Sequence, residues 1–212
     1  MKNILRLGGY ASLLLGFGFI AILIIDFAVL APMGFAGPDT PPELVMAVVN
    51  TSAIPFQLLD IFSMLGCSTL VLTVLALRER IASDAPNHMR LAVIAATIAT
   101  ALMVVVSTAD FRSIPILAAT NDVSTFRAIT SLLDGIFNGG IFAWGWTVFL
   151  CGWAGLQTAK LPSRLCYLLL LTGILGILTF VITIFGIFVV ALNVGWGLWL
   201  GYVLLRQPKP IT

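Results

Sequence analysis

The feature that most constrains this sequence is a long apolar segment, residues 165–205, that contains no charged side chain. As one helix it would be about 60 Å long at 1.5 Å per residue, about twice the ~30 Å hydrocarbon thickness of a bilayer. The segment must therefore fold back on itself, and we expect the turn near its midpoint, around Gly186. Uncharged or nearly uncharged runs also cover four earlier stretches, at 5–31, 54–77, 91–109 and 128–156.

The composition indicates the same class of protein. Of the 212 residues, 60% are hydrophobic and 9% are charged, whereas a soluble domain has about 25% charged residues. These values exclude a Rossmann enzyme, a nucleic-acid-binding module and a secreted disulfide scaffold. We therefore predict an all-α, polytopic membrane protein: one transmembrane domain over residues 1–212, folded as a six-helix bundle. Its predicted spans are about 5–31, 54–77, 91–109, 128–156, 165–184 and 187–205.

Positive charge predicts how this bundle is oriented. With six spans both termini lie on one side, and that side carries Lys2, Arg6, Arg78, Arg80, Arg90, Lys160, Arg164, Arg206 and Lys209. The other side has Arg112 and Arg127. The positive-inside rule then places both termini in the cytoplasm, with inner loops at 78–90 and 157–164 and outer loops at 32–53 and 110–127. A short surface helix is expected at 42–49, and the first span is expected to stay uncleaved.

Three aspartates, Asp26, Asp60 and Asp134, fall inside predicted spans. An aspartate at the centre of a membrane helix costs about 2.5–3.5 kcal/mol on the insertion scale, which makes an intramembrane acid a candidate for function. Each lies about 8–9 Å below the predicted outer end of its helix. Asn193 has a similar position if the last span begins near residue 187, so we expect one polar layer.

Helical spacing extends this layer into stripes. Gln57, Asp60 and Ser63 share one face of the second span, and Ser131, Asp134 and Asn138 share one face of the fourth. These faces should point inward because lipid offers no hydrogen-bond partner. We predict an outward-facing acidic pocket, with Arg112 and Arg127 near its mouth, that binds a ligand or ion through Asp26, Asp60, Asp134, Asn138, Gln57 and Asn193. The alternative is that these polar groups are packing contacts, bonded to a neighbouring backbone or to Arg127.

The sequence shows no catalytic or metal-binding set, so we expect neither a catalytic residue, nor a metal, nor a cofactor. His88 is the single histidine and lies in a polar inner loop. Cys67, Cys151 and Cys166 lack the spacing of metal ligands and are expected to be small apolar fillers. An intramembrane enzyme is therefore the third of the function classes that we consider.

Small residues predict how the helices pack. They repeat every fourth position at Gly8, Ser12 and Gly16, at Gly135 and Gly139, and at Asn193, Gly197 and Gly201. Such faces allow helix backbones to approach closely, and we favour packing within the chain over a dimer interface. Four tryptophans lie deeper than an interfacial belt and are expected to line the core: Trp144, Trp146, Trp196 and Trp199.

Two short motifs carry a family resemblance. The chain begins with Arg6-Leu7-Gly8-Gly9-Tyr10 and has Lys160-Leu161-Pro162-Ser163-Arg164-Leu165 before the fifth span. Together with the six-span layout, they resemble the bacterial domain of unknown function 4386 family. The chain departs from that family by one missing residue between Lys160 and Pro162 and by Arg164 in place of an aromatic residue. The resemblance implies a bacterial multi-pass protein and implies no catalytic residues.

Two function hypotheses follow. The first is a bacterial inner-membrane protein that binds or transports a small cationic or polar solute, with Asp60 and Asp134 as ligands or proton carriers. The second is a structural or accessory subunit that packs against another membrane protein, or against a second copy of itself, through its glycine faces. The expected partners are thus the lipid bilayer with either a solute or a membrane protein, and no nucleic acid.

The predicted topology can be tested by cysteine labelling in a background without native cysteines. Asp39→Cys and Asp122→Cys should react with a membrane-impermeant maleimide added outside intact cells, because both positions lie in outer loops. Asp84→Cys should react only after permeabilisation. External labelling of Asp84→Cys would contradict the orientation.

Overall fold

The computed structural model describes residues 2–35, 37, 40–182 and 184–206, and within these ranges every regular element is a helix. Asp39 and Lys209, which enter the expectations above, lie outside the described residues. The elements are α1 (Lys2–Ile24), continued by the π-helix η1 (Ile25–Leu30) and the 3-10 helix η2 (Ala31–Met33), then α2 (Pro42–Thr51), α3 (Ile54–Ile81), α4 (Pro86–Thr120), α5 (Val123–Thr158), α6 (Ser163–Thr179) and α7 (Phe185–Leu205).

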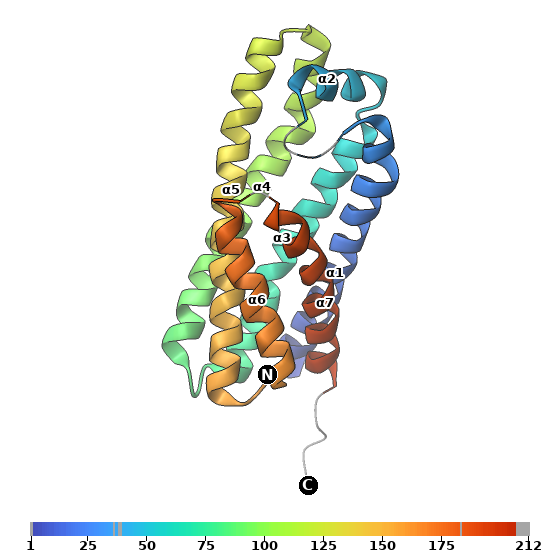
Figure 1. Ribbon diagram of the computed structural model, residues 1–212. Coiled ribbons are helices and arrows are strands. Elements are labelled where there is room, and N and C mark those ends of the chain that lie inside the picture. The colour runs from blue at the N-terminus through green and yellow to red at the C-terminus, as the bar shows by residue number, and fades with distance from the viewer. Residues whose placement is uncertain (1, 36, 38–39, 183, 207–212) are drawn as a thin grey trace.

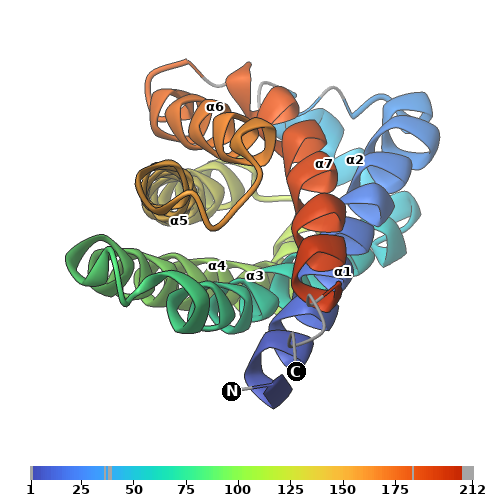
Figure 2. The same cartoon turned by 90° about the horizontal axis from the view of Figure 1, so that it is seen from below.

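Six helices form a closed ring in chain order. Each of α1, α3, α4, α5, α6 and α7 packs against the next, and α7 returns to α1 (Figure 2). Successive helices run in opposite directions, so the start of α1 and the end of α7 lie at the same end of the bundle (Figure 1). We call this the terminal end, and the opposite end the outer end. The helix α2 lies across the outer end (Figure 1).

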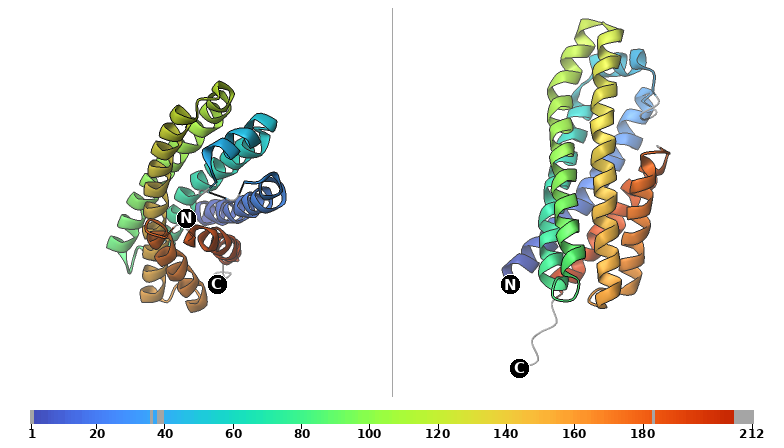
Figure 3. Two further views of the ribbon diagram at one scale, coloured as in Figure 1. Left: turned by 45° about the horizontal axis from the view of Figure 1, so that its top comes forward. Right: turned by 90° about the vertical axis from the view of Figure 1, so that its left-hand side faces the viewer.

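The helices differ strongly in length. Among the described residues, five segments are long and apolar enough to cross a membrane: Asn3–Met33, Ile54–Ile81, Pro86–Thr120, Val123–Thr158 and Phe185–Leu205. At 17 residues, α6 is about 26 Å long, whereas α4 and α5 extend beyond the α6–α7 hairpin at the outer end (Figure 3). The helices therefore support a helical membrane bundle, while the count of six spans and the side on which the termini lie stay predictions.

The structure confirms two sequence-based expectations and corrects a third. The uncharged segment 165–205 does fold back, since α6 ends at Thr179 and α7 begins at Phe185. The turn, which was expected around Gly186, lies before it, because Gly186 is already the second residue of α7. The expected surface helix is α2. The expected outer loop at 110–127 is wrong, because α4 continues to Thr120 and α5 begins at Val123. Only the dipeptide Asn121-Asp122 connects these two helices.

Asn121 and Asp122 explain why so short a connection works. Asn121 ends α4 in the left-handed conformation, with φ of 56°. Asp122 Oδ1 accepts hydrogen bonds from the backbone N–H groups of Ser124 and Thr125, which caps α5. Hydrogen bonds from Thr125 and Ser124 lower the pKa of Asp122 to about 2. The stabilising contribution of this cap is therefore fully present above the ordinary aspartate pKa and is lost as the pH falls through about 2.

Glycines set the closest contacts between helices. On the α1–α7 contact, Ser12 Oγ donates a hydrogen bond of 2.8 Å to the carbonyl of Gly197, and a Cβ on Gly197 would meet the backbone of Gly16 at 3.1 Å. On the α5–α6 contact, a Cβ on Gly145 would lie 2.6 Å from the backbone nitrogen of Ile177. The expected faces on α1 and α7 therefore pack within the chain, which confirms that part of the expectation. The expected face at Gly135 and Gly139 does not pack closely among the described residues, since a Cβ on Gly135 meets no atom within 4 Å and one on Gly139 meets Leu102 at 3.7 Å.

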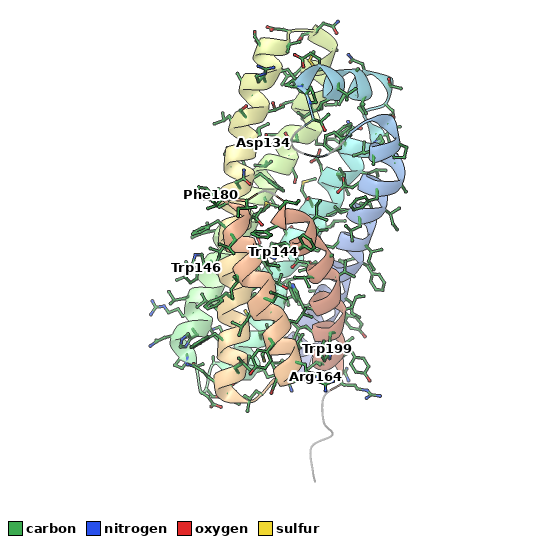
Figure 4. All side chains as sticks on the ribbon, viewed as in Figure 1. Asp134, Trp144, Trp146, Arg164, Phe180 and Trp199 are labelled. Atoms are coloured by element: carbon green, nitrogen blue, oxygen red, sulfur yellow. The ribbon has the colours of Figure 1, made fainter. Side chains whose placement is uncertain are left out.

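The main core occupies the half of the bundle nearer the terminal end, and all three cysteines are buried in it. Trp144 and Trp196 are 4% and 1% exposed, as expected, but Trp146 and Trp199 are 41% and 37% exposed. The prediction for these two is wrong; for Trp146 the reason is that residues two apart on a helix point to opposite sides. Trp146 instead joins a row of aromatic contacts on the outside of α5 and α6, formed by Phe180, Phe142, Trp146, Phe149 and Trp153 (Figure 4).

The close α5–α6 contact predicts a contrast between two glycines of α5. Gly145→Ala should lower the thermal stability of the purified protein, because a Cβ there overlaps the backbone of α6 and overpacking costs about 1–3 kcal/mol. Gly135→Ala should be neutral or stabilising, since a Cβ there meets no atom within 4 Å. Melting temperatures in detergent measure both effects, and an equal loss for the two variants would contradict the packing.

Candidate functional site

Four aspartates lie at the outer ends of rows of core residues. Within each row the residues are seven positions apart and so share nearly the same helix face. From the outer end these rows are Asp60, Cys67, Val74 and Ile81 on α3; Asp110, Met103, Ala96 and Met89 on α4; Asp134, Ile141 and Val148 on α5; and Asp26 on η1 with Phe19 and Ser12 on α1. The residues below the aspartates are buried or pack against the main core. Each aspartate therefore lies on the inward face of its helix.

The four aspartates also share one level. Counted from the terminal end at 1.5 Å per residue, Asp26, Asp110 and Asp134 lie about 36 Å along their helices and Asp60 about 32 Å. This level is beyond the end of α6, and Asp134 lies above Phe180 of the α6–α7 turn (Figure 4). The expected depth below the helix end holds for Asp60. Asp110 and Asp134 lie deeper, about 15 Å from the outer ends of α4 and α5, because those helices continue past the predicted loop.

The sequence analysis does not include Asp110 among the site residues, because it assigns Asp110 to the start of an outer loop. Its carboxylate is close enough to those of Asp60 and Asp134 for the charges to interact. Asp110 thus links the two acids that were expected to form the site. The seven-residue spacing of Ala96, Met103 and Asp110 is the sequence pattern that places Asp110 on the inward face of α4.

The four carboxylates are without a hydrogen-bonding or ion-pair partner in the part of the chain that the structure describes. Asp26, Asp60 and Asp110 are half-buried and Asp134 is exposed. A carboxylate in this setting must be hydrated or bound by a ligand, because burial without a hydrogen bond is costly.

The arginines expected near the mouth do not neutralise these acids. Arg127 lies 3.7 Å from the carboxylate of Glu43 on α2. Arg112 is exposed and has no partner among the described residues. The Arg127–Glu43 contact instead joins α5 to α2, which also donates a hydrogen bond from Asn50 to the carbonyl of Ala118.

Two of the predicted polar ligands, Gln57 and Asn138, lie on the same helices as the acids. Gln57 Nε2 donates a hydrogen bond of 3.4 Å to the carbonyl of Phe111. That carbonyl is free because Pro115, four residues later, has no N–H to donate within α4. Asn138, one turn from Asp134, is half-buried and has no hydrogen-bond partner among the described residues.

Asn193 does not belong to the acid layer, contrary to the expectation. It is 1% exposed, and its Oδ1 accepts hydrogen bonds from Trp144 Nε1 at 3.2 Å and from Trp196 Nε1 at 2.7 Å. Trp144 is ten residues beyond Asp134 on α5, about 15 Å nearer the terminal end. The prediction failed because the α6–α7 hairpin ends well below the outer end. Asn193 and the two indoles instead close the bundle beneath the acids.

The helix α2 covers the acids from the other direction. Met46 and Val49 on α2 pack with Ala118 on α4 and Phe126 on α5, and Val48 packs with Ile25 and Leu30 at the end of the first helix. We use the name acidic vestibule for the four aspartates together with α2 above them and the Trp144–Asn193–Trp196 cluster below them. No group of three His, Cys, Asp or Glu among the described residues could hold a metal ion.

The floor of the vestibule gives a testable prediction. Asn193→Leu should destabilise the protein, because each buried N–H that loses its acceptor costs about 1–3 kcal/mol. Asn138→Leu is the matched control and should have little effect, since Asn138 makes no hydrogen bond within the described chain. The melting temperature and the fluorescence of Trp144 and Trp196 report the change. Unchanged stability of Asn193→Leu would show that the two indoles find other acceptors.

Comparisons with known proteins give no match: no family model, no curated protein and no solved structure is similar to this chain. The resemblance to the domain of unknown function 4386 family therefore stays a prediction from the two short motifs. What the chain does has to be argued from its own geometry.

Proposed function

We propose that this chain is a membrane protein that binds, and in a second conformation releases, a small cation taken up through the acidic vestibule from the outer end. The observation that carries the proposal is the set of four aspartates at one level of the bundle axis without a protein partner. Half-buried carboxylates are costly unless a cation, a proton or water offsets their charge. Asp60 and Asp110, which are half-buried, and the exposed Asp134 interact through their charges and concentrate cations in the vestibule.

The arrangement favours a particular kind of cation. Because no described cluster has the geometry of a metal site, direct coordination of a divalent metal is disfavoured. The phenylalanine and isoleucine of the rows below the acids, Phe19 and Ile141, add apolar surface. A protonated organic amine matches both features, since its ammonium group pairs with carboxylates while its carbon atoms contact the apolar rows.

The same geometry suggests how the bundle sits in a bilayer. A hydrocarbon layer about 30 Å thick that begins at the terminal end reaches the α6–α7 turn, whose exposed residues include Phe180, Val181 and Ile184. The acids then lie at the outer membrane surface, and the α4–α5 tip with α2 projects beyond it. In this placement α6 is a short sixth span, and both termini face the cytoplasm of a bacterium in its inner membrane.

The accessory-subunit alternative requires glycine faces on the outside of the bundle that are available to a partner. The faces on α1, α7 and the inner part of α5 are occupied within the chain, which removes most of that support. Gly135 remains open, beside Asp134.

Cation binding can be measured by calorimetry on protein in nanodiscs, with methylammonium and butylammonium as probes. Asp60→Asn and Asp134→Asn should each weaken binding by about tenfold, equivalent to ~1.4 kcal/mol, because each removes one negative charge while keeping shape. The double variant should also change the pH profile of binding, since two titrating groups are lost.

Asp122→Asn is the matched control. It removes an acid at the outer end that lies outside the vestibule, and asparagine caps a helix about as well as aspartate. Binding that is equally strong in the double variant and the unchanged chain, with the same pH profile, would overturn the proposal. So would an equal loss in Asp122→Asn, because that would indicate a surface charge effect.

A further inference from the structure

A groove with mixed chemistry runs along the outside of the bundle at its terminal end, far from the acidic vestibule. It lies between α1 and α3, has a volume of about 560 Å³, and is lined by Ile4, Leu7, Leu72, Leu75, Arg78, Glu79 and Ala82. Its volume is in the range of small-molecule sites. Four of its leucine and isoleucine side chains are more than a third exposed, so the groove faces the surroundings of the bundle.

The groove results from the way α1 and α3 cross. At Gly8 the two backbones are so close that a Cβ would overlap Ala76. Beyond this contact the start of α1 diverges from the bundle (Figure 3). Ile4 and Leu7 lie on the diverging arm, and the last turns of α3 form the opposite wall.

The lining changes from apolar to charged along the helix axis. Leu72 and Leu75 lie deeper in the bundle, whereas Arg78 and Glu79 belong to the last turn of α3, which ends at Ile81. Where this end of the helix meets the membrane surface, charged groups lie at headgroup depth and leucines at acyl-chain depth. A phospholipid has this same order of groups.

The groove has two charged side chains in its lining, Arg78 and Glu79. Within the described residues, neither Arg78 nor Glu79 has a hydrogen-bond or ion-pair partner, and both are exposed. A ligand that carries a single charge would be attracted by one of these two side chains and repelled by the other. They complement a ligand with a phosphate and an ammonium group next to each other.

We propose that the α1–α3 groove is a binding site for a zwitterionic phospholipid with a primary amine, of the phosphatidylethanolamine type. Arg78 binds its phosphate, Glu79 accepts hydrogen bonds from its ammonium group, and an acyl chain lies along Leu7, Leu72 and Leu75. Phosphatidylcholine has the same charges, but its quaternary ammonium has no N–H to donate. Phosphatidylglycerol has the phosphate and no cation for Glu79.

A second groove on the bundle has no charged residue in its lining. It lies between α1 and α7, has a volume of about 430 Å³, and is lined by Ile20, Leu23, Ile24, Phe27, Ala28, Ala191 and Val194. Its lining offers no charged group to a headgroup. It serves as an internal comparison for nonselective contact with acyl chains.

Native mass spectrometry of the full chain in detergent, titrated with dioleoyl forms of the three lipids, tests the proposal. The unchanged protein should bind phosphatidylethanolamine about three- to fivefold more tightly than the other two, the scale of one partly exposed ion pair. Glu79→Gln should abolish the preference over phosphatidylcholine and leave phosphatidylglycerol binding equal or stronger. Arg78→Gln should weaken all three lipids, and Leu75→Trp, which fills the apolar part, should do the same.

Arg90→Gln is the matched control, because Arg90 is an exposed arginine at the same end of the bundle but outside the groove. It should leave all three affinities unchanged. Equal affinity for phosphatidylethanolamine and phosphatidylcholine in the unchanged protein would overturn the proposal, as would a preference that survives Glu79→Gln. An effect of Arg90→Gln as large as that of Arg78→Gln would also overturn it, by showing general attraction to the basic end.

Discussion

The lack of hydrogen-bond partners in hydrocarbon is the constraint from which the rest of this structure follows. Backbone groups bond to one another within helices. Several threonine hydroxyls in the spans bond to their own helix, as Thr73 does to the carbonyl of Thr69 and Thr172 to that of Leu168, and Thr100 on α4 donates to the carbonyl of Cys67 on α3. Helices then attract one another mainly through close packing. The glycine contacts of α1 with α7 and of α5 with α6 supply it by bringing backbones together, and they hold the ring closed at the terminal half.

One sequence pattern produces both halves of the bundle. The seven-residue rows that pack the terminal half continue along the same helix faces into the outer half, where the next member of each row is an aspartate. The change from Cys67 to Asp60 on α3, and from Met103 to Asp110 on α4, takes place within two turns. An apolar core and a charged vestibule therefore share one axis, and the level at which they meet is the level at which α6 and α7 turn back.

The sequence predicts features that depend on local physics and misses those that depend on how helices align. The turn between α6 and α7 follows from the length of one uncharged segment, and the helix α2 follows from its prolines and apolar residues. The extension of α4 past Pro115 was missed because a proline and Arg112 are typical of a loop, whereas the freed carbonyl of Phe111 is satisfied by Gln57 of another helix. Asn193 was placed too high because the sequence does not show how far α6 and α7 reach. Each seven-residue row can be recognised in the sequence. Only the alignment of the four helices shows that Asp110 lies at the level of the other three aspartates.

The closed floor determines what kind of motion a transport cycle would need. Trp144 on α5 and Trp196 on α7 donate to the same oxygen of Asn193, so the floor joins the α6–α7 hairpin to the rest of the ring at its centre. A solute held by the aspartates can pass only if these hydrogen bonds are exchanged for others, since two buried indole N–H groups without an acceptor would oppose opening. The π-helix η1, which begins beside Asp26, is a form of helix that is rare and often lies at functional sites. It contains Asp26 and leads toward α2, so under the proposed function a cation bound at Asp26 would act on the helix that covers the vestibule, while the glycine contacts below would keep the terminal half fixed.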